Sequence, residues 1–321
     1  MKVINQARGE GWALYNGDSC EVITGIPTAS IHYSIFSPPF ESLYTYSNSE
    51  RDMGNCKSSN EFARHFRFLA HEIFRITMPG RLVSVHCMDL MRSKSRDGVI
   101  GLRDFRGALI RIFERAGFVF HSNVTIWKDP VVAMQRTKAL GLLHKQIKKD
   151  SCMSRQGIPD YLLTFRKDGI NPEPVIGEFD SYAGDEEFMI RRSEQLESMG
   201  KAERTRFSID TWQRYASPVW MDINPSKTLQ KQSAREDADE RHICPLQLQV
   251  IERGIQLWTN PGDTVFTPFA GIGSEVYQAI LQGRRGIGIE LKESYYETAV
   301  RNCRNAETRT NGAGLFDDPT V

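Results

Sequence analysis

Residues 264–290, TVFTPFAGIGSEVYQAILQGRRGIGIE, decide the fold. The apolar residues at 264–266 predict a short strand, and a glycine-rich loop separates them from a helical pattern over 274–282. A second apolar run at 286–289 predicts another strand, which ends at Glu290. A strand, a helix and a second strand in this order are typical of a parallel sheet, in which the loop and the acid lie at the carboxyl edge.

The loop at 267–274 has the chemistry of a nucleoside site. Gly271 and Gly273 let the backbone approach a ligand, and the free N–H groups of the following helix favour a carboxylate or phosphate. Glu290 can accept hydrogen bonds from both hydroxyls of a ribose. The third glycine of the dinucleotide motif and the Gly-Lys-Ser/Thr step of a P-loop are absent. A tight turn would explain the glycines alone, but the whole strand, loop, helix, strand and acid order predicts a nucleoside-bearing cofactor.

The rest of the chain continues this alternation. Apolar runs predict further strands, at 12–15, 31–36, 82–86, 118–127 and 161–165. Apolar residues at helical spacing predict amphipathic helices, at 61–78, 102–116 and 244–258. We therefore expect an α/β fold, with a mostly parallel sheet, helices on both faces and a late antiparallel hairpin.

A rigid corner follows the strand at 31–36. It reads Ser37-Pro38-Pro39-Phe40, and two prolines force an extended path whose carbonyls have no local donor. Such carbonyls can point into the crevice at the strand ends, where ligands of open α/β sheets bind. A hydroxyl, a carbonyl and an aromatic ring together suit a flat ring that bears an amine. A proline turn with a buried phenylalanine is the alternative on these four residues alone.

Together, the Ser37–Phe40 corner, the Phe269–Gly273 loop and the Gly286–Glu290 strand resemble the S-adenosylmethionine-dependent DNA amino-methyltransferases. The catalytic motif precedes the cofactor loop, as in the permuted beta class of that family. The resemblance covers residues 12–167 and 239–302. It implies a Rossmann-like methyltransferase sheet, S-adenosylmethionine as the cofactor and double-stranded DNA as the partner, with base flipping.

The resemblance also implies a role for each matching residue. Ser37 and the Pro38 carbonyl would bind the target amine, Pro39 would stiffen the corner, and Phe40 would stack on the flipped base. The residues implied for the cofactor are Asp18, Phe269, Gly271, Gly273, Glu290, His242 and Pro245. Among these, Asp18 would accept from the adenine amine and Glu290 would hold the ribose. Neither a metal nor a covalent intermediate is expected, and the proton of the amine would leave to water.

Three positions depart from the family pattern, and the third of them, Ser37, leaves the target base open. Thr267 replaces the usual Asp before Pro-Phe, His32 stands where an acid usually precedes the catalytic strand, and Ser37 stands where Asp is common. A Ser-initiated motif leans to N4-cytosine in the family, whereas the segment at 239–247 resembles solitary phage-type members, several of them similar to N6-adenine enzymes. We expect N6-adenine by a small margin over N4-cytosine. A DNA-binding relative without turnover is the alternative outside the enzymes.

The middle of the chain supplies the expected DNA contacts. Residues 128–155 are rich in lysine and arginine, and phosphates would lie against them. Residues 168–240 are expected to form a target-recognition module that reads bases. The residues chosen as DNA contacts are Arg136, Lys138, Lys145, Lys148, Arg204, Arg206, Trp212 and Arg214. A solvated charged face, or a structural role, is the alternative for each of them.

Composition limits the remaining choices. The chain has 321 residues, 40% of them hydrophobic, with a net charge of +1, so any nucleic-acid surface must be local. The six cysteines are scattered without a C-x-x-C step, which indicates free thiols in a reducing cytoplasm. No membrane span or signal peptide is expected, and a homodimer is left open. The expected layout is a catalytic domain at 1–167 and 241–305, the module at 168–240, and a tail at 306–321.

Overall fold

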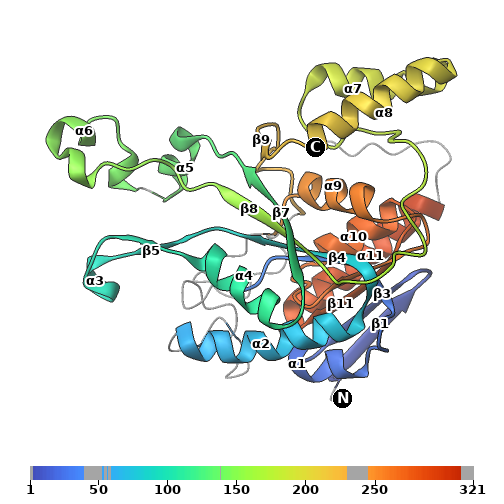
Figure 1. The fold of residues 1–321 in the computed structure, drawn as a ribbon, viewed down its shortest axis with the longest axis horizontal. Coiled ribbons are helices and arrows are strands. Elements are labelled where there is room, and N and C mark those ends of the chain that lie inside the picture. Colours follow the sequence, from blue (N-terminus) through green and yellow to red (C-terminus); the bar gives the residue numbers. More distant parts are fainter. Residues whose placement is uncertain are drawn as a thin grey trace.

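The protein is built on one large twisted sheet. The structure, a computed structural model, describes residues 3–39, 53, 56, 59–137, 139–229 and 245–311. Among these residues nine strands pair in the order β1-β2-β11-β10-β3-β4-β8-β7-β9 (Figure 1). Their bounds are β1 Asn5–Gly9, β2 Trp12–Asn16, β3 Ile31–Phe36, β4 Thr77–Cys87, β7 Val119–Ile126, β8 Asp160–Arg166, β9 Val219–Trp220, β10 Thr264–Thr267 and β11 Arg285–Glu290.

The five central strands, from β2 to β4 in that order, run parallel. The strands β8 and β7 continue the sheet as an antiparallel hairpin, and β9 lies parallel to β7 at the edge. The central strands are buried on both faces, as in β3, where five of the six residues are buried. The predicted mostly parallel sheet with a late hairpin is confirmed.

Helices cover both faces of this sheet (Figure 1). On one face lie α1 (Ser19–Val22), α2 (Ser59–Ile76) and α4 (Phe105–Arg115), which bury their apolar stripes against β3, β4 and β8. On the other face lie α9 (Leu248–Trp258), α10 (Ser274–Leu281) and α11 (Glu293–Asn311). The glycine-rich loop after β10 and the Ser-Pro-Pro corner after β3 are therefore supported by helices packed on both faces of the sheet.

Several predicted boundaries were wrong. The strand β4 begins at Thr77 and includes Pro79-Gly80, which had been expected to end a helix. Leu102 lies in β6 (Gly101–Arg103), and the next helix begins only after Asp104, whose carboxylate caps it. The helix α11 continues to Asn311, so residues 306–311 are helical rather than part of a tail.

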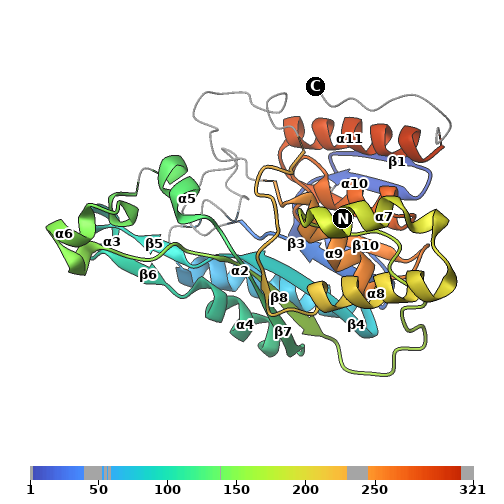
Figure 2. The same cartoon turned by 90° about the horizontal axis from the view of Figure 1, so that it is seen from above.

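Two projections extend from the same side of the sheet (Figures 1 and 2). One is the small pair β5 (Leu90–Arg92) and β6 with α3 (Lys94–Asp97) between them. The other joins β7 to β8 and carries α5 (Pro130–Thr137) and α6 (Gln146–Lys149). The second projection carries the lysine- and arginine-rich residues at 128–155, whereas the first was not predicted.

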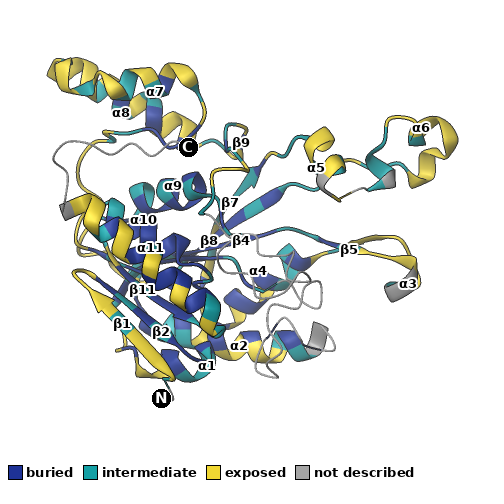
Figure 3. Ribbon diagram, turned by 180° about the vertical axis from the view of Figure 1, so that it is seen from behind, coloured by how far each residue is buried: buried dark blue, intermediate teal, exposed yellow. Residues whose placement is uncertain are grey.

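Residues 168–229 form a helical pair and then rejoin the sheet. The helices α7 (Glu187–Glu194) and α8 (Lys201–Tyr215) enclose a small core of their own, around Phe207 and Met189. Their outer faces are mostly exposed (Figure 3). The strand β9, which follows them, pairs with β7. Within the described residues, no helix combines the length and apolarity needed to cross a membrane.

Candidate active site

The predicted catalytic and cofactor motifs meet at one edge of the sheet. The strands β2, β11, β10 and β3 are neighbours and parallel, so their carboxyl ends lie side by side. Asp18 follows β2, Glu290 ends β11, the glycine loop follows β10, and Ser37 follows β3. Residues far apart in the chain are thus neighbours at the edge where ligands of open α/β sheets bind.

Ser37 is held in place from the next strand. Its Oγ lies 2.6 Å from Nδ1 of His86, near the end of β4, and 3.4 Å from the His86 carbonyl oxygen. Ser37 is half-buried, Pro38 is buried and Pro39 is half-buried. Phe40 lies outside the described residues, so its predicted stacking role stays a prediction. The hydroxyl of Ser37 is therefore oriented before any substrate arrives.

His86 is connected in turn to a buried carboxylate. Its Nε2 lies 3.2 Å from Oδ2 of Asp160, within ion-pair range but without the alignment of a hydrogen bond. The other carboxylate oxygen of Asp160 accepts from Nζ of Lys128. Burial opposes ionisation of Asp160, but His86 and Lys128 outweigh it, so the pKa of this carboxyl is lowered. In the sequence His86 has the pattern of a core residue, and no local motif points to Asp160.

The glycine loop has two distinct glycines. Gly271 has φ +52°, and a Cβ built there would meet no atom within 4 Å. Gly273 has φ +89°, and its Cβ would lie 3.0 Å from Cβ of Ala299 in α11. Gly271 thus borders open space at the edge, whereas Gly273 allows α10 and α11 to pack closely.

Glu290 fixes the loop from the neighbouring strand. The Gly271 N–H donates to Oε2 of Glu290 at 2.7 Å, and the Lys292 N–H donates to Oε1 at 2.9 Å. The carboxylate faces the same edge as the open space at Gly271. Nearby, the hydroxyl of Thr267 is buried and has no hydrogen-bond partner among the described residues. An acid, an open backbone and an unsatisfied hydroxyl fit a polar ligand such as a nucleoside.

Asp18 lies in a turn that adjoins both parts of this site. The Asn16 side chain donates to the backbone carbonyl of Glu290 at 2.9 Å, and the Ser19 hydroxyl donates to the carbonyl of Pro268. Oδ1 of Asp18 accepts from the N–H of Cys20 at 2.9 Å and caps α1. The fold therefore brings the predicted adenine contact beside the predicted ribose contact.

Two aromatic rings of the core pack against Phe269 of the glycine loop. Phe269 stacks on Phe66 of α2 with ring centroids 6.4 Å apart and meets the edge of Phe36 at 5.9 Å. Of the two residues expected near the methionine carboxylate, Pro245 is half-buried just before α9, and His242 lies outside the described residues. The predicted contact of Phe269 with a cofactor stays a prediction, because its ring is shared with these two phenylalanines.

A buried acid stands behind the glycine loop. Glu275, in the first turn of α10, is 4% exposed. Burial raises its pKa to about 8, while its own backbone N–H opposes the shift and the negative charge of Glu290 adds to it. No sequence motif had singled out this residue.

The predicted DNA contacts fall into two groups. Lys145 and Lys148 are exposed on the basic projection, while Lys138 and the side chain of Arg136 are not described. In α8, Arg204 donates to the carbonyls of Met199 and Glu197. The remaining three are Arg206, paired with Asp210, Arg214, paired with Glu186, and Trp212, which is half-exposed. Their proposed contacts with DNA stay predictions.

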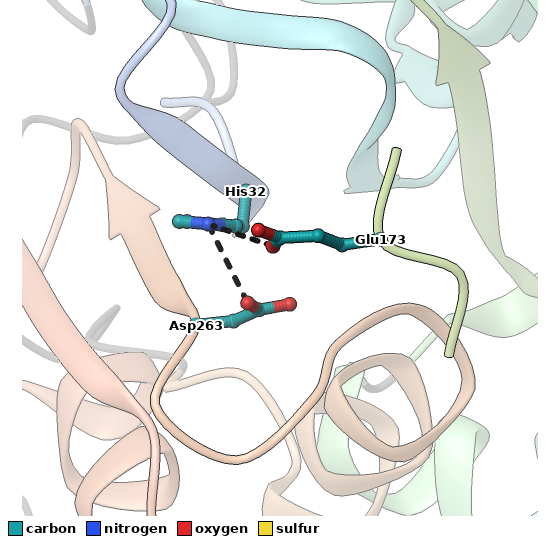
Figure 4. Close-up of side chains that lie close together, drawn as sticks. All are labelled: His32, Glu173 and Asp263. Carbon is teal, nitrogen blue, oxygen red and sulfur yellow. Dashed lines mark ion pairs between the residues drawn. The ribbon is translucent and has the colours of Figure 1, made fainter. Parts of the chain in front are cut away.

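One further cluster lies away from this edge, at the start of β3 and β10. His32 Nε2 lies 3.4 Å from Asp263 and 3.9 Å from Glu173, which is a geometry that could suit a metal (Figure 4). The buried guanidinium of Arg81 lies 3.3 Å from Asp263 and 3.4 Å from Glu173. Because Arg81 already balances both carboxylates, this cluster is an ion-pair network that joins the loop after β8 to the sheet.

Known protein families and proteins have sequences similar to this chain. A family model described as DNA methylase, of the N6/N4 type, matches residues 31–301. The orphan methyltransferase M.BamHII of Bacillus amyloliquefaciens is 26% identical over 286 residues, which span 87% of this chain and 91% of that protein. The type II methyltransferase M.MjaI of Methanocaldococcus jannaschii is 25% identical over 228 residues, 70% of this chain and 61% of that protein.

Two solved structures share the fold. A Thermus thermophilus protein assigned as a DNA modification methylase, in complex with S-adenosyl-L-methionine, superposes with a TM-score of 0.58 at 20% identity, over 91% of this chain and 95% of that one. The cytosine-N4-specific PvuII DNA methyltransferase superposes with a TM-score of 0.56 at 16% identity, over 97% and 96% of the two chains. At these identities the likeness supports the sheet and the layering of its helices.

Proposed function

The chain belongs to the N6/N4 DNA methylase family, and from this premise we propose that it transfers a methyl group from S-adenosylmethionine to the exocyclic amine of a base in double-stranded DNA. The observation that carries the proposal is the adjacency of β3 and β10. Ser34 in β3 pairs with Phe266 in β10, so the Ser-Pro-Pro corner and the glycine loop leave neighbouring strand ends. An acceptor for an amine and a site for a nucleoside-bearing methyl donor therefore share one edge.

The chemistry explains why two acceptors are needed. An exocyclic amine is a poor nucleophile because its lone pair is delocalised into the base. Ser37 Oγ and the Pro38 carbonyl would each accept one N–H, which favours a pyramidal nitrogen whose lone pair is available. This interaction strengthens toward the transition state and so lowers the barrier. The sulfonium of the cofactor supplies an already activated methyl group, and the protein contributes mainly orientation.

The residues for the cofactor are those gathered around the glycine loop. Glu290 would accept from the ribose hydroxyls, Asp18 from the adenine amine, and the open face of Gly271 would adjoin the methionine portion. The target base would be flipped out of the duplex to reach Ser37, because its amine is inaccessible inside the helix. Lys145 and Lys148 on the basic projection would contact phosphates.

The target base is proposed to be adenine, at N6, by a small margin. The alternative is N4 of cytosine, which a serine at position 37 favours within the family. Both amines present the same pair of N–H groups, so Ser37 and Pro38 accept either. A DNA-binding protein without turnover is the non-enzymatic alternative, and the ordered Ser37–His86 contact speaks against it.

One experiment separates these possibilities. Unmethylated plasmid DNA is incubated with the protein and S-adenosylmethionine labelled in the methyl group, then digested to nucleosides and chromatographed. Label in N6-methyldeoxyadenosine supports the proposal, label in N4-methyldeoxycytidine supports the alternative, and no label removes the enzymatic function. Ser37→Ala should abolish the label, and transfer that is unaffected by this change would remove Ser37 from the site.

A further inference from the structure

Four neighbouring strands each place one polar side chain in a continuous line. Ser37 follows β3, His86 lies near the end of β4, Asp160 begins β8, and Lys128 follows β7. Because β8 runs against the other three, its first residue lies at the same edge as their last ones. The line joins the proposed acceptor of the target amine to a carboxylate that is 4% exposed.

The contacts assign the protons along this line. The buried carboxylate of Asp160 lies 3.2 Å from Nε2 of His86, and its negative charge favours the neutral tautomer with the proton on Nε2. Nδ1 is then a free acceptor at 2.6 Å from Ser37 Oγ, a shorter contact than the 3.4 Å from that Oγ to the His86 carbonyl. In this tautomer Ser37 donates its hydroxyl proton to His86, and Oγ can still accept an amine N–H.

We propose that His86 receives, through Ser37, the proton that the target amine loses on methylation. This inference rests on the proposed function. The amine nitrogen attacks the methyl carbon, the carbon–sulfur bond breaks, and its electron pair stays on sulfur. The nitrogen, now positively charged, gives one proton to Ser37 Oγ as the hydroxyl proton of Ser37 passes to Nδ1 of His86. The imidazolium later releases a proton to water, so His86 is a positioning residue that acts through Ser37.

The surroundings of His86 suit this role. Asp160 would stabilise the imidazolium, and the same carboxylate is paired with Lys128. Asp89, which follows β4, and Arg106 of α4 both act on the pKa of the buried thiol of Cys87, the residue next to His86. Neutral histidine can accept a proton near neutral pH, whereas water is a far weaker base at the same position.

The first test follows single-turnover methylation of unmethylated plasmid DNA as a function of pH, with labelled S-adenosylmethionine and enzyme in excess over sites. The wild-type methylation rate should decrease as the pH is lowered, because protonation of a single group removes the proton acceptor. His86→Asn keeps an acceptor atom toward Ser37 but cannot take the proton, so its rate should be about 100-fold lower and independent of pH on the acid side.

Three controls keep this result interpretable. His121 in β7 lies outside the line, and His121→Asn should keep the wild-type rate and acid limb. His86→Asn should remain folded at the assay temperature and keep the wild-type affinity for S-adenosylmethionine. If His86→Asn keeps the wild-type rate or the wild-type acid limb, or if the wild-type rate does not fall toward acid, the proposal is overturned.

The second test does not depend on turnover. In protein labelled with ¹⁵N at histidine, the His86 resonances are identified by their loss in His86→Asn, and the neutral ring should carry its proton on Nε2. A proton on Nδ1 would overturn the proposed relay even if DNA is methylated. Absence of methylation by the wild type, with the expected tautomer present, would instead count against the proposed function.

Discussion

The backbone N–H of Gly271 donates to Oε2 of Glu290 across 2.7 Å, which joins the loop after β10 to the end of β11. The second oxygen of Glu290 accepts from the N–H of Lys292 at 2.9 Å. Both oxygens are therefore held by backbone before a ligand binds, and their remaining lone pairs keep a fixed direction. A preorganised carboxylate loses little freedom when it accepts hydroxyl groups.

Glu290→Gln tests this arrangement. The amide group can satisfy only one of the two backbone donors and cannot accept with both atoms, so the affinity for S-adenosylmethionine should fall by about 10- to 100-fold, the value of one to two charge-assisted hydrogen bonds. Isothermal titration calorimetry measures this change. Glu293→Gln, at an exposed acid in the first turn of α11, is the matched control and should bind normally. Equal affinities in the two variants would remove Glu290 from the cofactor site.

The two loop glycines should respond differently to alanine. At Gly273 the new methyl group would meet Ala299, so Gly273→Ala should lower the thermal unfolding midpoint. At Gly271 the methyl group meets no protein atom, so the loss of stability should be only the roughly 1–2 kcal/mol of a left-handed alanine, while cofactor binding should be lost. Gly262→Ala has the same open surroundings and a φ of +82° at a turn before β10, and it should bind the cofactor normally. Normal binding by Gly271→Ala would contradict the proposed position of the cofactor.

Glu275 predicts a dependence of stability on pH. Its folded-state pKa of about 8 lies above the ordinary 4.5, so the folded state binds the proton more tightly than the unfolded state. This tighter proton binding contributes fully to the free energy of unfolding below pH 4.5, and the contribution is lost as the pH rises toward 8. Glu275→Gln has no ionisable group at this position and so does not lose this stability. Relative to the wild type, its free energy of unfolding should therefore increase by about 1.4 kcal/mol for each pH unit across this window. Urea unfolding at several pH values measures the gain, and the exposed Glu297→Gln should show none.

Lys145 and Lys148 predict a change in salt dependence. If both contact phosphates, the double change to alanine should weaken binding to duplex DNA of any sequence and lower the slope of log affinity against log salt by about 2. Fluorescence anisotropy at several salt concentrations measures the slope. The double variant Arg64→Ala and Arg67→Ala, at exposed positions on α2, removes the same charge elsewhere. Equal slopes in the two double variants would exclude the basic projection from the DNA surface.

The sequence predicted the edge of the active site because the decisive residues stand beside strands. Ser37 follows an apolar run that two prolines stop, and Glu290 ends another, so each could be placed at a strand end without knowing the strand order. The contact of Ser37 with His86 could not be predicted, since it depends on β4 lying beside β3. The position of Asp160 was still harder to predict from the sequence. It begins its strand, and the first residue of a strand lies at this edge only if that strand runs antiparallel to its neighbours.

The predicted DNA contacts on α8 and the buried aromatic residues beside them show a second limit. The sequence pattern around 204–215 predicts a DNA-reading surface, yet Tyr215 is buried and its hydroxyl accepts from the N–H of Ala183 at 2.7 Å. Arg253 of α9 packs between the rings of Tyr215 and Trp220, with its guanidinium carbon 4.9 Å from each ring centre. A sequence pattern does not distinguish an aromatic residue that faces a partner from one that covers a buried arginine.

Arg253 of α9 is expected to attach the helical pair α7–α8 to the rest of the fold. Its guanidinium is fully buried, donates to the carbonyl of Ala183 and pairs with Asp222, so it joins α9 to both ends of the segment 183–222. Arg253→Met keeps much of the volume but removes the cationic partner of Asp222, and the free energy of unfolding should fall by about 3–5 kcal/mol. Hydrogen exchange should rise first in α7 and α8, because their attachment is lost before the sheet opens. Arg191→Met removes an exposed pair with Glu187 and should change stability by less than about 0.5 kcal/mol. Faster exchange spread evenly over the sheet and the helical pair would show that Arg253 supports the whole core and does not specifically hold these two helices.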